Sequence, residues 1–151
     1  MSDPAGSTDL VITRIFDAPR ELVYRAFVDP DQLAAWFGPV GWSVPRDTVD
    51  IDARVGGHQR FTMVSDDDPG VRSVVAGTFT EIVENELLVG EQRLHDPDVG
   101  DIVMQLRIEL HDEGGKTRMV LRQGPFGADL GRDAQQGWNS SFTKLDTLLG
   151  A

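Results

Sequence analysis

Residues 102–123 read IVMQLRIELHDEGGKTRMVLRQ, and this stretch decides the fold class. Apolar side chains occupy alternate positions on both sides of the central segment 113–116, and most positions between them are polar or charged. A period of two is typical of strands with one buried face, and a Gly-Gly pair between two such runs is typical of a hairpin turn. The stretch therefore predicts an antiparallel hairpin with one apolar face and one wet face.

Alternation of the same kind recurs through residues 44–123 and indicates further strands. Residues 72–83 and 86–94 are predicted as two of them, and the acidic, Pro- and Gly-containing segment 66–70 has the chemistry of a hairpin loop. An earlier strand is predicted at residues 10–16. We therefore expect about seven antiparallel strands that share one apolar face.

Helices are predicted on either side of the strand region. Pro19 is expected at the first position of one short helix, and Asp29 is expected as the N-cap of a second, which ends before Pro39. A longer helix is expected to begin at the N-cap Asp133 and to end with a cap at Gly150. Only this last helix is long enough to cover the apolar sheet face. The sequence thus predicts an α+β fold in which a curved antiparallel sheet wraps around the C-terminal helix.

Length and charge limit the classes of partner. The chain has 151 residues, and we expect a flexible tail over residues 1–7 and one domain over residues 8–151. It carries 14 Lys and Arg against 25 Asp and Glu, so its formal net charge is −11. Such a charge repels phosphate backbones and anionic lipid surfaces, which argues against nucleic-acid and membrane partners. The lack of Cys excludes disulfides and thiolate metal sites.

The sequence also lacks the usual targeting signals. No apolar run approaches the roughly 20 residues that a membrane-spanning helix needs. The first eight residues have neither the basic region nor the apolar region of a signal peptide. We therefore expect a cytoplasmic protein.

Several short strings follow one another along the chain at characteristic spacing. They are FDAPRELVYRAF (16–27), DP (29–30), WFGP (36–39), VGG (55–57), GTFTEI (77–82), ELL (86–88) and GW (137–138). In this order and spacing they resemble the helix-grip fold of the START-like SRPBCC superfamily, and within it the family named after the activator of the 90 kDa heat-shock protein's ATPase. The resemblance implies a cavity between the sheet and the long helix, which in the superfamily commonly binds an apolar small molecule.

The residues that we expect around such a cavity are apolar, with a few amides. The aromatic residues after the second short helix either seal the core or form a cavity mouth, and the inward strand residues either pack under the helix or form a cavity wall. The amides near strand ends are either satisfied within the fold or act as polar anchors for a ligand. The candidate binding residues are Trp36, Phe37, Trp42, Gln59, Phe61, Met63, Phe79, Gln92, Met104, Leu106, Met119, Leu121, Gln123, Trp138 and Phe142.

Two local questions stay open at the level of sequence. Glu91 and Arg93 share one face of their strand and Gln92 takes the other, but the pattern does not decide which face is buried. An inward Glu91 and Arg93 would favour an enzyme. Gly137 inside the last helix either allows a close approach of the helix to the sheet or clears space for a ligand beside Trp138.

No motif predicts a catalytic residue, a metal site or a cofactor. No pair of the three histidines has metal-ligand spacing, no Ser lies in a nucleophile elbow, and no Gly-rich string matches a phosphate loop. The leading hypothesis is therefore a protein that binds a small, largely apolar molecule without catalysis. The alternatives are an enzyme of the polyketide-cyclase or aromatase type and a partner that activates a chaperone ATPase. A homodimer is left open.

Overall fold

The computed structural model describes residues 8–96, 100–126 and 128–150, so the tail expected over residues 1–7 lies outside the described residues. Within these ranges the chain forms a sheet of eight strands, three α-helices and one 3-10 helix. In chain order the elements are β1 (Thr8–Phe16), α1 (Arg20–Val28), α2 (Pro30–Trp36), β2 (Trp42–Ser43), η1 (Arg46–Thr48), β3 (Asp50–Ile51), β4 (His58–Ser65), β5 (Arg72–Val83), β6 (Leu87–Asp96), β7 (Gly100–Glu113), β8 (Lys116–Phe126) and α3 (Ala128–Gly150).

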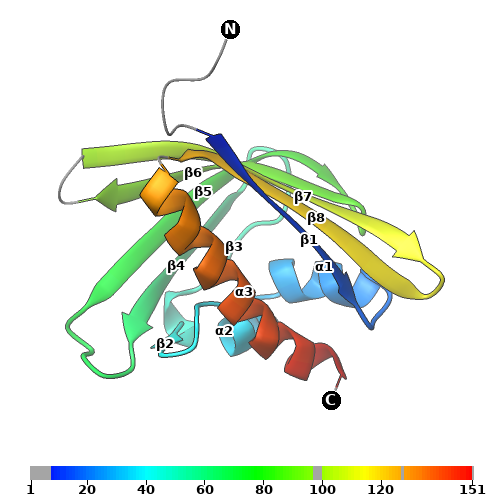
Figure 1. Cartoon of the computed structure of the whole chain (residues 1–151), viewed down its shortest axis with the longest axis horizontal. Helices are drawn as coiled ribbons and strands as arrows, with labels where there is room; N and C mark the ends of the chain where they lie inside the picture. Colours follow the sequence, from blue (N-terminus) through cyan, green and yellow to red (C-terminus); the bar gives the residue numbers. More distant parts are fainter. Residues whose placement is uncertain (1–7, 97–99, 127, 151) are drawn as a thin grey trace, which may run out of the picture.

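The strands form one antiparallel sheet in the order β1-β8-β7-β6-β5-β4-β2, and β3 pairs separately with β4. The sheet curls, and α3 crosses its concave side while α1 and α2 lie below it (Figure 1). This arrangement confirms the predicted α+β helix-grip fold. The alternation expected from residue 44 onward produces only the two-residue β3 before residue 55, because η1 and segments without regular structure make up the rest of residues 44–54.

The hairpin of β7 and β8 has the predicted alternation. Ile108 pairs with Leu121 and Leu110 pairs with Met119, and all four side chains are buried. Positions between them, such as Arg107 and its cross-strand partner Arg122, belong to the outer face. The hairpin therefore contributes a continuous apolar strip to the core.

The ends of the helices differ in part from the sequence-based expectation. Asp29 caps α2 as predicted, since its side chain accepts hydrogen bonds from the backbone N–H groups of Asp31 and Gln32. Pro19 is the N-cap residue of α1, one position before the predicted first helical position. The prediction for α3 is wrong at its start, because α3 begins at Ala128 and Asp133 lies inside it. Residues 128–133 contain no proline that would stop a helix. A residue such as Asp133, which suits an N-cap, can therefore also lie inside the helix.

The buried side of α3 supplies the centre of the core. Phe142 and Leu145 are fully buried, and Trp138 is 8% exposed. Phe142 packs edge-on against Phe16 of β1 and stacks with Trp36 of α2, at centroid distances of 5.6 and 6.1 Å. These contacts fix α3 against both the sheet and the short helices.

Candidate ligand-binding site

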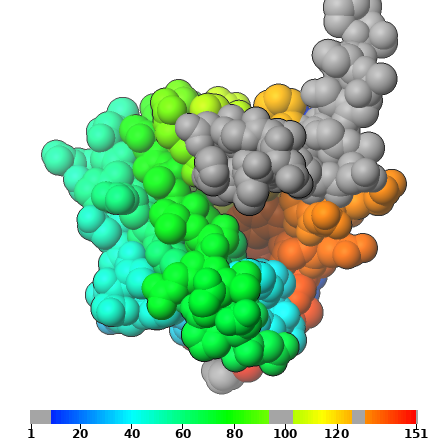
Figure 2. Space-filling view, turned by 90° about the vertical axis from the view of Figure 1, so that its left-hand side faces the viewer, coloured from blue at the N-terminus to red at the C-terminus, as the bar shows by residue number. Residues whose placement is uncertain are grey.

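Two adjoining cavities lie between α3, the sheet and the corner that follows α2. The larger has a volume of about 230 Å³ and the smaller about 30 Å³. The surface is hollowed between the green strands and the orange helix α3 (Figure 2). The two cavities share Phe37, Gln92 and Trp138, so these residues stand at the boundary between them. The lining of the larger cavity is Phe37, Pro39, Met63, Val75, Gln92, Gln123, Ala134, Gly137, Trp138 and Ser141.

Aromatic rings form one side of the site. Phe37 packs edge-on against Phe61 of β4 at 4.6 Å and against Trp138 of α3 at 5.4 Å between ring centroids. Trp138 in turn stacks with Phe142 at 5.6 Å. Phe37 is therefore clamped between the sheet and α3, with one side left toward the cavities.

Polar contacts tie the corner after α2 to α3. The backbone N–H of Val40 donates to Ser140 Oγ at 2.8 Å, and Lys144 Nζ donates to the carbonyl oxygen of Trp42 at 3.1 Å. Partial burial lowers the pKa of Lys144, although nearby Asp66 acts in the opposite direction. The corner that carries Phe37 is thus held by the helix that forms the opposite wall of the cavity.

Three buried polar side chains form a hydrogen-bonded chain at the cavity wall. The indole N–H of Trp138 donates to Gln123 Oε1 at 2.8 Å, and Gln123 Nε2 donates to Gln92 Oε1 at 2.6 Å. Gln92 and Gln123 are each 6% exposed and Trp138 is 8% exposed. We call these residues the amide relay. Because an indole N–H can only donate, it fixes the orientation of both amides.

The sheet register answers the open question about β6. Gln92 points inward and pairs with the buried Met104, whereas Glu91 and Arg93 are exposed. The strand therefore presents a neutral amide to the cavity and keeps its charges on the outer face.

The space beside Gly137 decides between the two roles considered for this residue, close packing against the sheet and clearing space for a ligand. A Cβ atom built at this position meets no heavy atom within 4 Å, so the sheet does not approach the helix closely there. Gly137 lines the larger cavity, and its carbonyl oxygen accepts a hydrogen bond from Ser141 Oγ at 2.9 Å. The interpretation that Gly137 allows close packing against the sheet is wrong.

Some of the predicted site residues line one of the two cavities, and the others do not. Phe37, Met63, Gln92, Gln123 and Trp138 line the larger cavity, and Gln59, Phe79 and Leu106 line the smaller one. The others line neither cavity. Trp36, Phe61, Met104, Met119, Leu121 and Phe142 are buried in the core, and Trp42 is half-buried in β2.

Several lining residues were not among the candidate binding residues, although Gly137 had been considered as a position that clears space for a ligand. Ala134, Gly137 and Ser141 recur at intervals of three and four residues on the same side of α3 as Trp138. Small residues at helical spacing on a buried stripe were the available signal, because they leave space that larger side chains would fill. Pro39 and Val75 had no comparable signal.

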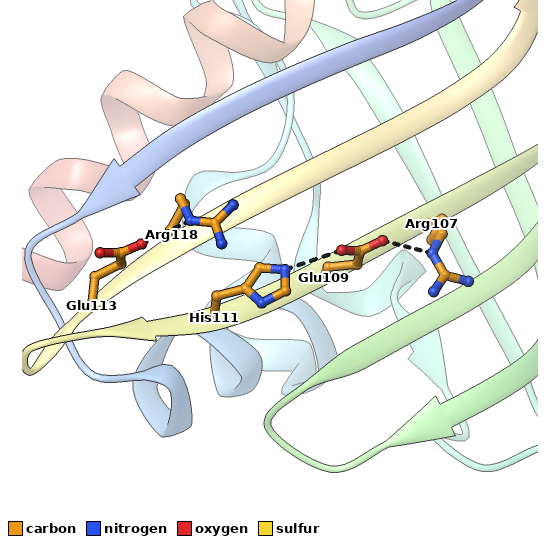
Figure 3. Close-up of polar contacts among 5 residues, drawn as sticks. All are labelled: Arg107, Glu109, His111, Glu113 and Arg118. Carbon is orange, nitrogen blue, oxygen red and sulfur yellow. Dashed lines mark hydrogen bonds and ion pairs between the residues drawn. The ribbon is translucent and has the colours of Figure 1, made fainter.

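The principal cluster of charged groups on β7 and β8 belongs to the outer face of the sheet. Glu109 accepts from Arg107 Nε at 2.9 Å and lies 3.0 Å from His111 Nε2, and Arg118 Nε donates to Glu113 at 2.8 Å (Figure 3). The hydrogen bonds from Arg107 and then His111 hold the pKa of Glu109 below its ordinary value. These charges therefore form their own surface network, separate from the amide relay.

Within the part of the chain that the structure describes, the remaining ionisable groups do not form a metal centre. His58 Nε2 lies 3.0 Å from Asp50 on the surface. The side chain of His95 lies outside the described residues. Across the described part of the chain, no three His, Asp or Glu side chains come together as a metal site requires. No helix among the described residues has the length and apolar character to cross a membrane.

A curled antiparallel sheet that holds a long C-terminal helix against its concave face defines the helix-grip class of the START-like SRPBCC superfamily. Within this class the chain belongs to the Activator of Hsp90 ATPase homolog 1-like protein family, whose sequence profile matches residues 17–150. The resemblance inferred from the short sequence strings is confirmed.

Solved structures of bacterial proteins show the same fold. A protein from Chromobacterium violaceum is 27% identical, with a TM-score of 0.84 over 95% of this chain and 97% of that one. The AHSA1 protein from Silicibacter pomeroyi is also 27% identical, with a TM-score of 0.81 over 95% of this chain and 98% of that one. A protein from Nitrosomonas europaea is 25% identical, with a TM-score of 0.77 and 94% coverage of both chains. A search of curated proteins finds no significant match.

Proposed function

We propose that the protein binds a small, largely apolar molecule in the cavity between α3 and the sheet. The observation that carries this proposal is the larger cavity of about 230 Å³ with its predominantly apolar lining. A dry cavity of about 150 Å³ in another protein is sufficient for benzene. The space beside Trp138 is therefore suited to a molecule of one or two fused rings.

Binding is favoured over acid–base catalysis by the register of β6. The cyclase hypothesis needs an inward acid or base whose pKa is perturbed, and an inward Glu91 and Arg93 would have favoured it. Both are exposed on the opposite face, and the inward position belongs to Gln92. The cytoplasm stays our proposed location, and a neutral small molecule is the proposed partner.

A bulky substitution in the cavity wall tests the proposal. Ala134 lines the larger cavity, so Ala134→Phe should fill part of it, whereas Leu148 on the same helix is 37% exposed and Leu148→Phe should leave it open. Tetralin, a neutral bicyclic hydrocarbon, is titrated into both variants and the wild type by calorimetry. We expect Ala134→Phe to weaken binding at least about tenfold, which corresponds to 1.4 kcal/mol.

The matched variant makes the result decisive. Leu148→Phe should bind tetralin with the wild-type affinity. Equal affinity in all three proteins would mean that the hydrocarbon binds elsewhere, which would contradict the proposal. A lack of binding to the wild type would also contradict it. Native mass spectrometry of the purified protein provides an independent search for a retained ligand.

A further inference from the structure

We infer that the cavity selects neutral ligands that carry a hydrogen-bond acceptor, such as a ketone oxygen, and that Gln92 Nε2 is the group that donates to it. This inference rests on the proposed function and specifies the ligand class of the same site. Its basis is the direction of the amide relay, which runs from Trp138 through Gln123 to Gln92.

The direction of the relay follows from chemistry. The indole N–H of Trp138 has no acceptor function, so Gln123 must turn its oxygen toward it. The nitrogen of Gln123 then faces Gln92, which must present its own oxygen. Reversing either amide would bring two donors together and leave buried groups without partners. The last group of the relay is therefore the NH2 of Gln92, a donor.

The position of Gln92 places this donor at the site. Gln92 lines both cavities, and its cross-strand neighbour on β5 is Gly77. A Cβ atom at Gly77 would lie 3.7 Å from Gln92 Cγ and 3.0 Å from the backbone oxygen of Glu91. The absence of a side chain at Gly77 thus allows the backbones of β5 and β6 to lie close together beside Gln92.

The surrounding lining favours neutral over charged ligands. Among the described lining residues of the two cavities only Glu91 has a charged side chain, and that side chain is exposed on the outer face. A buried carboxylate or ammonium group would lose its hydration and meet no opposite charge. A carbonyl oxygen needs only one or two donors, which an amide NH2 supplies.

Three probes with one ring skeleton separate these possibilities. Tetralin has no polar group, 1-tetralone adds a carbonyl oxygen, and 1,2,3,4-tetrahydro-1-naphthoate adds a negative charge. Their affinities for the wild-type protein are measured by calorimetry at one pH and salt concentration. We expect 1-tetralone to bind about three- to tenfold more tightly than tetralin, as one added hydrogen bond allows. We expect the carboxylate to bind at least about tenfold more weakly than the ketone.

Variants assign the preference to the relay. Gln92→Leu should lower the affinity for 1-tetralone to the affinity that the same variant has for tetralin, so that the preference for the ketone disappears. Gln105→Leu removes an exposed amide from β7 and should change neither value. The carbonyl stretching frequency of bound 1-tetralone should be lower in the wild type than in Gln92→Leu, because only the wild type donates a hydrogen bond to it.

The outcomes separate this inference from the proposed function. Equal affinities of tetralin and 1-tetralone for the wild type would overturn the inference and leave the apolar cavity as the binding site. Tightest binding of the carboxylate would overturn it as well. Both comparisons use only the wild-type protein, so neither requires a variant to fold. If none of the probes binds, the proposed function fails and the inference fails with it.

Discussion

Replacing Gly137 by alanine should stabilise the protein, although this residue lies beside the cavity. The position is inside α3, and a Cβ atom there meets no heavy atom within 4 Å. Alanine is favoured over glycine within a helix by about 0.8–1 kcal/mol, and no steric cost opposes this gain. We therefore expect the free energy of unfolding to rise by about 1 kcal/mol, which corresponds to roughly 2–4 °C in melting temperature for a chain of this size.

Urea denaturation of the wild type and Gly137→Ala measures this difference. The midpoint should rise while the slope of free energy against urea stays the same, since the surface exposed on unfolding hardly changes. Gly150→Ala is the control, because Gly150 is the last residue of α3 and a Cβ there is also unhindered. Its effect should be smaller, since helix ends gain less from propensity.

The opposite result would refute the geometry of the site. A loss of about 1 kcal/mol or more in Gly137→Ala would mean that the new methyl group meets the sheet. In that case α3 would pack closely at this position, and the space assigned to a ligand beside Trp138 would not exist. The size of the cavity and the proposed function would then both need revision.

Further predictions concern the core and the outer face. Phe142→Ala should destabilise the protein by about 3–5 kcal/mol, because the ring is fully buried, whereas Leu148→Ala should cost less than about 1 kcal/mol in the same urea assay. Thr117→Val should cost about 1–2 kcal/mol, because it leaves the carbonyl oxygen of Ala18 without the hydrogen bond of 2.7 Å that Thr117 donates; an unchanged midpoint would contradict this. Glu109→Gln should destabilise the protein at neutral pH. The folded-state pKa of Glu109 lies below its ordinary value of 4.5. The ionised carboxylate therefore stabilises the folded protein above that pH, and this contribution is lost as the pH falls through the folded-state pKa. Urea midpoints of wild type and Glu109→Gln should therefore converge as the pH falls through the folded-state pKa of Glu109, and a difference independent of pH would argue against it.

The fold could be predicted from the sequence because each long strand separates its faces clearly. In β7 the inward positions Met104, Ile108 and Leu110 are apolar and the positions between them are mostly polar. A shift of one residue would exchange core and solvent along the whole strand, so the pattern determines which face is buried. The start of α3 lacked such a signal, because caps and first turns are decided by a few residues whose chemistry also suits a helix interior.

The site was less predictable because its geometry depends on contacts between distant segments. The face of β6 was ambiguous, since residues 87–89 are all apolar and Gly90 has no side chain. Such a run does not alternate between apolar and polar residues, so it does not indicate which face is buried. Only the pairing of Gln92 with Met104 settles it. The amide relay likewise joins three elements that no local pattern relates.

The amide relay and the charged cluster on β7 follow different physical rules. On the outer face, water screens the charges of Arg107, Glu109 and His111, so ionic groups can be placed there at little cost. Inside, an unpaired charge would be expensive, whereas neutral amides are tolerated when their hydrogen bonds are made. Gln92 and Gln123 meet this condition through a donor that cannot reverse its role. A cavity that cannot use charge can still distinguish ligands by the direction of a hydrogen bond, and the indole of Trp138 fixes that direction.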